Sequence, residues 1–281
     1  MPSSSLTLRA PAKINLSLRI LGKRPDGFHE LTTRMCRVSI FDTLQVTQRE
    51  DTEVSLTCSD PSVPTDETNL VMKALRAFEA ATGQRHGWDI HLEKQIPHGA
   101  GLGGGSSDAA ALLKAVNQLF GLPLSLEKIV SVAAQIGSDV PFFLYEQCCD
   151  ATGRGEALTP VNFPWTLPIV LIKPPFGIPT AWAYRSWADS KETRGVLYAP
   201  QQCPWGDMVN DLERPAFEKY ALLPTLKNWL LDQGETKAAL MSGSGSTLYA
   251  IAESVAAAGE LAKKARALCG ESTWVQIATT L

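Results

Sequence analysis

The stretch at residues 97–110, Pro-His-Gly-Ala-Gly-Leu-Gly-Gly-Gly-Ser-Ser-Asp-Ala-Ala, carries the strongest chemical signal in this chain. Glycine occupies most positions from Gly99 to Gly105, and an apolar run follows from Ala109 to Leu113. A glycine loop that opens onto a helix presents unpaired backbone N–H groups, and its lack of side chains lets a phosphate approach them. The stretch therefore predicts an anion site. A flexible linker is disfavoured, because the stretch joins two strongly patterned elements without a polar spacer.

Two common nucleotide motifs fit this loop poorly. A P-loop is excluded because Gly105 stands where that motif needs lysine. Residues 99–104 match the G-x-G-x-x-G of dinucleotide-binding folds, but the strand before that motif is buried on both faces and continuously apolar. Here residues 88–96 alternate between apolar and polar, and Leu-Pro-Leu at 122–124 stands where an acidic ribose ligand belongs. The loop must belong to another phosphate-binding fold.

The order Pro-x-x-x-Gly-Leu-Gly-Gly-Gly-Ser-Ser-Asp-Ala-Ala resembles the phosphate loop of the small-molecule kinases that include galactose, homoserine, mevalonate and phosphomevalonate kinases. The resemblance implies a two-domain α+β fold with the active site in the interdomain cleft. A turn-rich change in composition near residues 149–157 places the expected boundary between an N-terminal ATP-binding domain at 1–155 and a C-terminal substrate-side domain at 156–281.

Other segments resemble one branch of this superfamily, the 4-diphosphocytidyl-2-C-methyl-D-erythritol kinases. They are Ala10–Leu16, Gly22–Leu31, Gly137–Phe143, Gly153–Glu156, Asn210–Glu213 and Met241–Ser246. One departure is Phe28, where that branch usually has tyrosine. Stacking on a ring survives this change, whereas a contact through a phenol oxygen does not.

The resemblance implies transfer of the γ-phosphoryl group of ATP, with Mg²⁺, to the 2-hydroxyl of the cytidyl substrate in the non-mevalonate route to isoprenoid precursors. Asp139 is the expected general base, because a carboxylate can accept the proton of the attacking hydroxyl. Lys13 is its expected partner, since an ammonium keeps a neighbouring carboxylate ionised and stabilises charge on the transferring group. A plain structural salt bridge between the two residues is the alternative interpretation.

The same resemblance implies the binding residues. The residues expected around ATP are Asn69, Leu70, Lys94, Pro97, Gly99, Gly101, Leu102, Gly103, Gly104, Gly105, Ser106 and Ser107. Those expected around the substrate are Asn15, Phe28, His29, Asp139, Thr180, Tyr184, Gly243 and Gly245. Ser107 is the expected Mg²⁺ ligand, directly or through water, with Ser106 as its rival; a serine that binds no metal would serve as a helix cap. Tyr184 could instead be a core aromatic residue.

Two other functions stay open at this point. The chain could be a kinase of the same superfamily that acts on another small alcohol, such as mevalonate or homoserine. The Phe28-His29 pair argues against this, because a simple alcohol needs no clamp for a base. It could also be a nucleotide-binding regulator without turnover, although Lys13 and Asp139 argue for catalysis.

Period-2 and period-3.6 patterns give the elements that must position these residues. Strands are expected at residues 6–9, 14–20, 35–40, 42–48, 53–58, 88–96, 169–172, 247–252 and 274–278, with a turn at 10–13 because Pro11 cannot donate to a ladder. Helices are expected at about 69–82, from the glycine loop to 120, after Ser125, at 180–187, around 217–231 and at 255–269.

The 281 residues are 44% hydrophobic and 20% charged, which is typical of a globular protein with a sizeable core. The net charge of -3 favours neither a nucleic-acid nor a membrane partner. The six cysteines form no C-x-x-C pair and are expected to be free thiols in a reducing compartment. Residues 1–5 lack the apolar core of a signal peptide, so we expect a cytoplasmic protein, as a monomer or weak homodimer.

Overall fold

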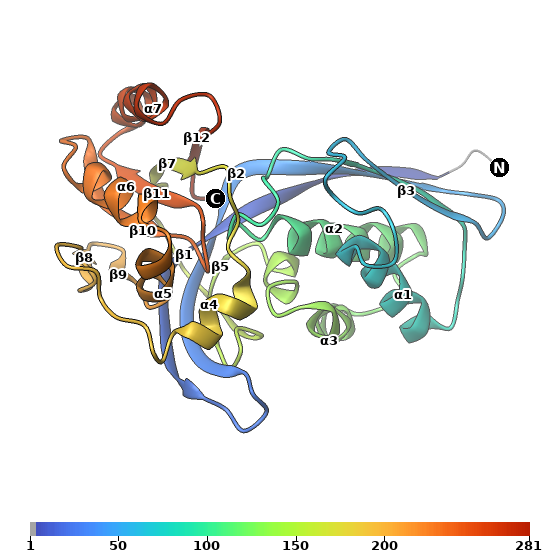
Figure 1. Ribbon diagram of the computed structural model, residues 1–281. Helices are drawn as coiled ribbons and strands as arrows, with labels where there is room; N and C mark the ends of the chain where they lie inside the picture. Colours follow the sequence, from blue (N-terminus) through green and yellow to red (C-terminus); the bar gives the residue numbers. More distant parts are fainter. Residues whose placement is uncertain (1–3) are drawn as a thin grey trace. The chain divides into compact units, whose positions relative to one another are not determined.

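The computed structural model describes residues 4–281, so the first three residues of the N-terminal segment considered above lie outside the described residues. The chain divides into two compact units, each assembled from separate stretches (Figure 1). Unit 1 comprises residues 4–12, 40–98 and 103–146, and unit 2 comprises residues 13–39, 99–102 and 147–281. The stretches alternate because two long strands, β1 (Ser5–Lys23) and β2 (His29–Gln48), contribute to both units. The boundary expected between residues 155 and 156 stays a prediction.

Unit 1 combines a small mixed sheet with three packed helices (Figure 1). Strand β4 pairs in parallel with β3 and antiparallel with residues 43–48 of β2. Helices α1, α2 and α3 pack on one another, and the 3₁₀ helix η1 packs on α2 and α3. The elements are β3 (Val54–Cys58), α1 (Leu70–Thr82), β4 (Trp88–Glu93), α2 (Gly104–Leu119), α3 (Leu126–Ile136) and η1 (Pro141–Leu144).

Local signals set the helix ends in unit 1. The Asn69 side chain accepts a hydrogen bond of 2.8 Å from the Val71 N–H at the start of α1, and Gly83 ends this helix at φ 70°. Ser125 caps α3 by accepting from the Lys128 N–H. The predicted helix at 69–82 and the predicted cap at Ser125 are both confirmed.

Unit 2 contains an antiparallel sheet in the order β10-β11-β7-β12, covered by α6 and α7. In the same unit β9 runs parallel to β1 at residues 17–18, and β5 pairs with β2 at residues 33–35. The elements are β5 (Cys148–Thr152), β6 (Ala157–Val161), β7 (Pro168–Lys173), α4 (Thr180–Ser186), β8 (Gln201–Cys203), β9 (Gly206–Asn210), α5 (Glu213–Lys219), α6 (Leu222–Leu231), β10 (Thr236–Met241), β11 (Leu248–Ala252), α7 (Val255–Cys269) and β12 (Trp274–Thr279).

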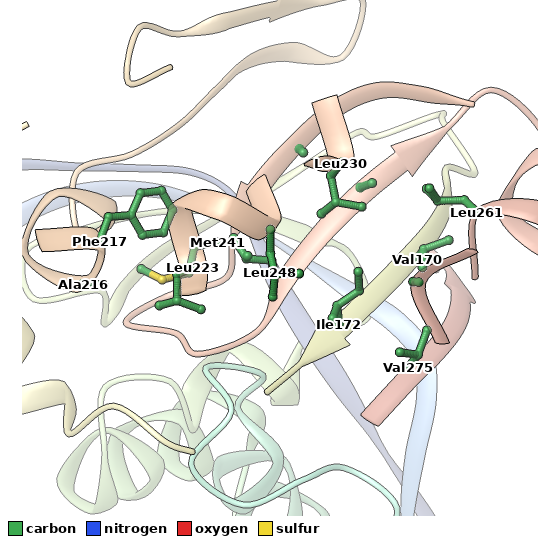
Figure 2. Close-up of a cluster of buried hydrophobic side chains, with 14 of the residues drawn as sticks. Val170, Ile172, Ala216, Phe217, Leu223, Leu230, Met241, Leu248, Leu261 and Val275 are labelled. Atoms are coloured by element: carbon green, nitrogen blue, oxygen red, sulfur yellow. The ribbon is translucent and has the colours of Figure 1, made fainter. Parts of the chain in front are cut away.

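One apolar face of this sheet forms the core of unit 2. Figure 2 shows Val170 and Ile172 of β7 beside Leu248 of β11, with Leu223 and Leu230 supplied by α6. All five side chains are fully buried. Because residues two apart on a strand face the same side, the alternating positions of the sheet and the helical stripes meet in one layer. This layer supports the loops that leave β7 and β10.

The structure corrects three of the expected elements. Strand β1 is continuous through Pro11, where a turn was expected, and β2 is one strand rather than two. Proline removes an N–H donor, but its φ is compatible with extended backbone, so a strand can pass through it. The single helix expected around 217–231 is two helices, α5 and α6, and Pro224 lies in the first turn of α6, where proline is tolerated. No helix within residues 4–281 is both long and apolar enough to cross a membrane.

The expectation of six free thiols is wrong for one pair. Cys36 and Cys148 form a disulfide, with 4.5 Å between their Cα atoms. They lie on the paired strands β2 and β5, where Met35 is opposite Cys149, so the antiparallel register brings Cys36 opposite Cys148. The chain separation of 112 residues hides this pairing from any spacing rule. Cys58, Cys149, Cys203 and Cys269 are free thiols.

Candidate active site

The glycine stretch forms a loop that leads into α2. Gly99, Gly101 and Gly103 have φ angles of 63°, 76° and 70°, a region that side-chain-bearing residues rarely adopt. A Cβ on Gly101 would also lie 2.2 Å from the carbonyl oxygen of Ser242, so this position is closed to any side chain. Helix α2 begins at Gly104 and directs its free N–H groups toward the loop. The predicted loop-to-helix transition is confirmed.

The two serines after the glycines have different surroundings. Gly103 is the N-cap of α2, with no side-chain cap bond, so both serines lie inside the first turn. Ser107 is 1% exposed, and its Oγ atom is buried without a hydrogen-bond partner among the described residues. Ser106 is half-buried. A buried hydroxyl without a protein partner retains its capacity to bind a ligand.

Lys94, one of the residues expected near ATP, lies in a buried charge cluster of unit 1. Its ammonium bonds the carboxylates of Asp42 and, at 2.9 Å, Asp108. Burial raises the pKa of Asp108 to about 7; Lys94 opposes this shift and the negative charge of Asp42 adds to it. Burial alone would lower the pKa of Lys94, but Asp108 and Asp42 reverse that effect, so the net direction is upward. The sequence interpretation did not single out Asp42 or Asp108.

The remaining predicted residues of unit 1 surround the start of α2 and the end of α3. Leu70 follows the cap Asn69, and a Cβ on Gly105 would lie 3.6 Å from the Leu70 Cδ1 atom. Pro97 is half-buried at the beginning of the loop. Asp139 is half-buried in the short segment between α3 and η1. Because the segment that carries Asp139 is short and joins two helices, the position of its backbone is well defined.

In unit 2, a chain of hydrogen bonds fixes Lys13. Its Nζ atom donates to Asn15 Oδ1 at 2.7 Å, and Asn15 Nδ2 donates to Thr33 Oγ1 at 2.8 Å. Thr33 donates in turn to the carbonyl oxygen of Ser17, and the Tyr249 hydroxyl donates to the backbone carbonyl of Asn15. Lys13 and Asn15 are 4% and 2% exposed, so the ammonium is held at a defined place on β1. The prediction that they share a direction is confirmed.

The second glycine segment lies against Lys13. A Cβ on Gly243 would lie 3.5 Å from Lys13 Nζ and 3.3 Å from the carbonyl oxygen of Gly101. Its φ is 55°, and that of Gly245 is 84°. Asn210 Nδ2 donates to the Gly243 carbonyl at 2.8 Å, and this hydrogen bond holds the segment in place. The structure therefore brings together three predicted positions: Lys13 on β1, Gly101 in the first glycine segment and Gly243 in the second.

Thr180 also joins this segment. Its hydroxyl is 2.9 Å from the Ser244 hydroxyl, and Thr180 itself begins α4 at an exposed position. Ser242 Oγ donates to the Gly101 carbonyl at 2.9 Å, which connects the two glycine segments directly.

The predicted base-binding residues Phe28, His29 and Tyr184, which we call the aromatic group, all lie in unit 2. The rings of His29 and Tyr184 are stacked, with centroids 5.5 Å apart and 30° between their planes. Trp187 meets the His29 ring edge-on at 6.1 Å. Phe28 is 52% exposed, and the guanidinium carbon of Arg154 lies 4.7 Å from its ring centroid. Burial, together with the charge of Lys23, lowers the pKa of His29.

Trp187 and Arg154 were not predicted as members of this group. Trp187 lies three residues after Tyr184 at the end of α4, a spacing that puts two side chains on one helix face, so the sequence held that signal. Arg154 lies in the turn between β5 and β6, and no local pattern connects it to Phe28, which lies more than a hundred residues earlier.

The predicted residues thus form two groups, one in each unit. Lys13, Asn15, Phe28, His29, Gly99, Gly101, Leu102, Thr180, Tyr184, Gly243 and Gly245 belong to unit 2. Asn69, Leu70, Lys94, Pro97, Gly103, Gly104, Gly105, Ser106, Ser107 and Asp139 belong to unit 1. The contact expected between Lys13 and Asp139 stays a prediction, as do the individual binding and catalytic roles.

Comparisons with known proteins agree with this fold and loop. Residues 69–147 match the family described as GHMP kinases N terminal domain, and residues 204–270 match GHMP kinases C terminal. A homoserine kinase from Cytophaga hutchinsonii, 21% identical, superposes with a TM-score of 0.72 over all of this chain and 96% of its own. The chain is therefore a GHMP kinase in fold and class, as the glycine stretch indicated.

The sequence relatives narrow this class. A 4-diphosphocytidyl-2-C-methyl-D-erythritol kinase from Methylacidiphilum infernorum is 41% identical over 95% of this chain and 94% of its own length. One from Geobacter metallireducens is 37% identical over 98% of both chains. A crystal structure of 4-(cytidine 5'-diphospho)-2C-methyl-D-erythritol kinase, 34% identical, gives a TM-score of 0.80 over 98% of this chain and all of that one. The chain belongs to the 4-diphosphocytidyl-2-C-methyl-D-erythritol kinase family, which confirms the resemblance of residues 10–31.

Proposed function

We propose that this ATP-dependent small-molecule kinase transfers the γ-phosphoryl group of ATP to the 2-hydroxyl of 4-diphosphocytidyl-2-C-methyl-D-erythritol, in the non-mevalonate route to isoprenoid precursors. The observation that carries the proposal is the left-handed glycine loop leading into the N-terminus of α2, in a chain of this family. Such a loop supplies N–H donors and the positive end of a helix dipole, which together suit a triphosphate.

The ATP side of the site is proposed to be the loop and its neighbours in unit 1. Backbone N–H groups of residues 101–107 would bind the phosphates, and Asn69 and Leu70 would border the adenosine. The position of Leu70 next to Gly105 supports this, because it places an apolar side chain beside the phosphate loop. Pro97 and Gly99 would hold the loop in a shape that admits the nucleotide.

Ser107 is the proposed holder of Mg²⁺. Mg²⁺ prefers oxygen ligands, keeps several waters and is often bound through one or two protein groups plus substrate phosphates. The buried Oγ atom of Ser107, which has no hydrogen bond within residues 4–281, fits that requirement. When bound, the ion would neutralise charge on the phosphate oxygens of ATP. Ser106, which is half-buried, is the alternative ligand.

Asp139 and Lys13 are the proposed catalytic residues. In the proposed reaction the substrate 2-oxygen attacks the γ-phosphorus, its proton passes to the Asp139 carboxylate, and the bond to the β-phosphate oxygen of the departing ADP breaks. The Lys13 ammonium would stabilise negative charge on the transferring group. Asn15 holds this ammonium through the 2.7 Å hydrogen bond, so the ammonium is already in position before the reaction begins.

The aromatic group of unit 2 is proposed to bind the cytosine of the substrate. An aromatic face stacks on a base, and the histidine nitrogens can read a base edge. The burial of His29 lowers its pKa and so favours the neutral ring, in which one nitrogen donates and the other accepts. Thr180, Gly243 and Gly245 would border the rest of the substrate.

Replacing Phe28 by alanine is expected to raise the KM for the cytidyl substrate by about 5- to 100-fold, the scale of a lost base–aromatic stack. The KM for ATP should change little, because Phe28 belongs to the aromatic group and not to the phosphate loop. Initial rates measured with each substrate in turn give the two values. The variant Phe28→Tyr keeps the ring and serves as the control. Equal increases in both KM values would contradict the clamp.

A substrate panel tests the proposed function. ADP release is measured with ATP, Mg²⁺ and, separately, the cytidyl substrate, mevalonate and homoserine. We expect turnover with the cytidyl substrate alone. Turnover with mevalonate or homoserine but not with the cytidyl compound would identify another superfamily kinase, and tight ATP binding without turnover on any alcohol would identify a regulator.

We also propose that the protein acts in the cytoplasm, where its co-substrate ATP is made, and that it is a monomer or weak homodimer. Sedimentation velocity over a range of concentrations distinguishes these two states.

Thiol titration of the purified protein under denaturing conditions tests whether Cys36 and Cys148 are oxidised, since the bonded state leaves Cys58, Cys149, Cys203 and Cys269 as reactive thiols.

A further inference from the structure

Three buried charged residues of unit 1 lie at the two ends of the phosphate loop, and we call Asp42, Lys94 and Asp108 the loop clasp. Asp42 is fully buried on β2, the Lys94 side chain is 6% exposed, and Asp108 is 1% exposed on α2. The Lys94 ammonium bonds both carboxylates. Three charges taken out of water in this way are costly unless their geometry is well satisfied.

The loop clasp holds both ends of the loop. At the start, Asp42 Oδ1 accepts hydrogen bonds from the backbone N–H groups of Gln95, at 2.6 Å, and Ile96, at 2.8 Å. These are the two residues immediately before Pro97. At the far end, Asp108 lies just after the first turn of α2 and is bonded to Lys94. One carboxylate therefore fixes the entry, and the lysine connects that carboxylate to the exit.

The same two ends also lie close together. A Cβ on Gly104, the first residue of α2, would lie 3.0 Å from Ile96 Cγ2 and 3.2 Å from Lys94 Nζ. A side chain at Gly104 would therefore have to displace the Ile96 side chain or the Lys94 ammonium by a few tenths of an ångström. The N–H groups of the first turn of α2 are set in place by this close approach.

We propose that Asp42 is a positioning residue for ATP: acting through Lys94, Asp108 and two backbone N–H groups, it fixes the spacing between the two ends of the phosphate loop. Asp42 itself is fully buried and would touch neither substrate. On this account Lys94 affects ATP binding as part of the loop clasp, and not through a direct contact with adenosine. The inference rests on the proposed function, because it assumes that the loop binds the triphosphate of ATP.

The test measures ATP binding and turnover separately in the full chain. Isothermal titration calorimetry with ATP and Mg²⁺ gives Kd, and initial rates give kcat and both KM values. The variant Asp42→Asn keeps the side-chain shape but places an uncharged amide beside the Lys94 ammonium. We expect Kd for ATP to rise about tenfold or more, the scale of one lost charge-assisted hydrogen bond. The KM for the cytidyl substrate should stay within about twofold, since the aromatic group is untouched.

Two further variants keep the test decisive if Asp42→Asn folds poorly. Asp108→Asn removes one carboxylate from the exit and should weaken ATP binding in the same sense. Lys94→Met should raise the Kd for ATP as Asp42→Asn does. The double variant with both substitutions should raise it little further, because the effects of residues in one network are not additive. The matched control is Asp89→Asn on β4, an exposed aspartate paired with Arg49, which should bind ATP as the wild type does.

If Asp42→Asn and Asp108→Asn bind ATP normally while Lys94→Met does not, Lys94 contacts the nucleotide itself and the positioning role is wrong. A lower melting temperature with unchanged Kd for ATP in all three variants would make the loop clasp purely structural and overturn the inference. If the wild type binds no ATP, the proposed function fails first.

Discussion

Replacing Asp139 by asparagine is expected to lower kcat by about 10²–10⁴-fold, the usual range for removal of a general base. The amide has the size of the carboxylate but cannot accept the proton of the attacking hydroxyl. Asp139 occupies a short segment between α3 and η1, so the substitution leaves both elements in place. Coupled measurement of ADP release at saturating ATP and cytidyl substrate gives kcat, and calorimetry confirms that ATP still binds.

Asp207→Asn is the matched control for this prediction, because Asp207 is an exposed aspartate on β9 that has no proposed role. It should keep wild-type kcat. If Asp139→Asn also kept nearly normal turnover, then either another group would take the proton or the reaction would need no base. A loose phosphoryl-transfer transition state needs little help from a base, and either explanation would leave Asp139 without its proposed role.

Replacing Lys227 by methionine is expected to reduce the free energy of unfolding by about 3–5 kcal/mol, the cost of leaving a buried charge without its partner. Lys227 and Glu213 have side chains that are 1% exposed each, and the lysine also donates to the Leu197 carbonyl. Burial raises the pKa of Glu213, and Lys227 opposes this shift. Without the ammonium the carboxylate is stranded in the core of unit 2. Urea-induced unfolding followed by tryptophan fluorescence measures the loss.

Two comparisons sharpen this stability prediction. Lys263→Met removes an exposed pair with Glu260 on α7, where the side chains are 71% and 60% exposed, and should cost no more than about 1 kcal/mol. The double variant Lys227→Met and Glu213→Gln should recover part of the loss, because it removes the stranded charge and keeps an acceptor for the Met241 N–H. A loss for Lys227→Met as small as that for Lys263→Met would show that the buried pair contributes little.

The elements with strong local signals were predictable from the sequence. Helix α7 has the predicted bounds, and the helix expected at about 69–82 is α1, because an apolar stripe and the residues that end a helix are local properties. The glycine loop was predictable because a run of glycines before a helix is also a local pattern. Strand β1 was not, because Pro11 suggested a break and only tertiary pairing shows that the strand continues. The disulfide between strands β2 and β5 depends on register, which no sequence spacing reveals.

Some contacts of the candidate site could likewise be predicted from the sequence, and others could not. Lys13 and Asn15 share a strand direction, so their 2.7 Å contact follows from period-2 geometry. The loop clasp was missed, although the sequence held one sign of it. Asp42 occupies an inward position between Ile40 and Leu44, in the part of β2 from Val38 to Val46 where the alternating buried residues are otherwise apolar, and a charge there needs a buried partner. Its partners are far away in sequence, so they could be found only in the folded chain.

³¹P nuclear magnetic resonance directly follows the transfer of one phosphoryl group from ATP to one oxygen atom of the substrate. The wild-type protein is incubated with ATP, Mg²⁺ and the cytidyl substrate. We expect one new phosphomonoester signal, whose intensity corresponds to one phosphomonoester for each ADP formed. Its phosphorus should couple to carbon 2 of the substrate, and the cytidine diphosphate signals should stay unchanged. Release of inorganic phosphate without a phosphomonoester, or a phosphomonoester formed on mevalonate or homoserine but not on the cytidyl compound, would contradict the proposed function.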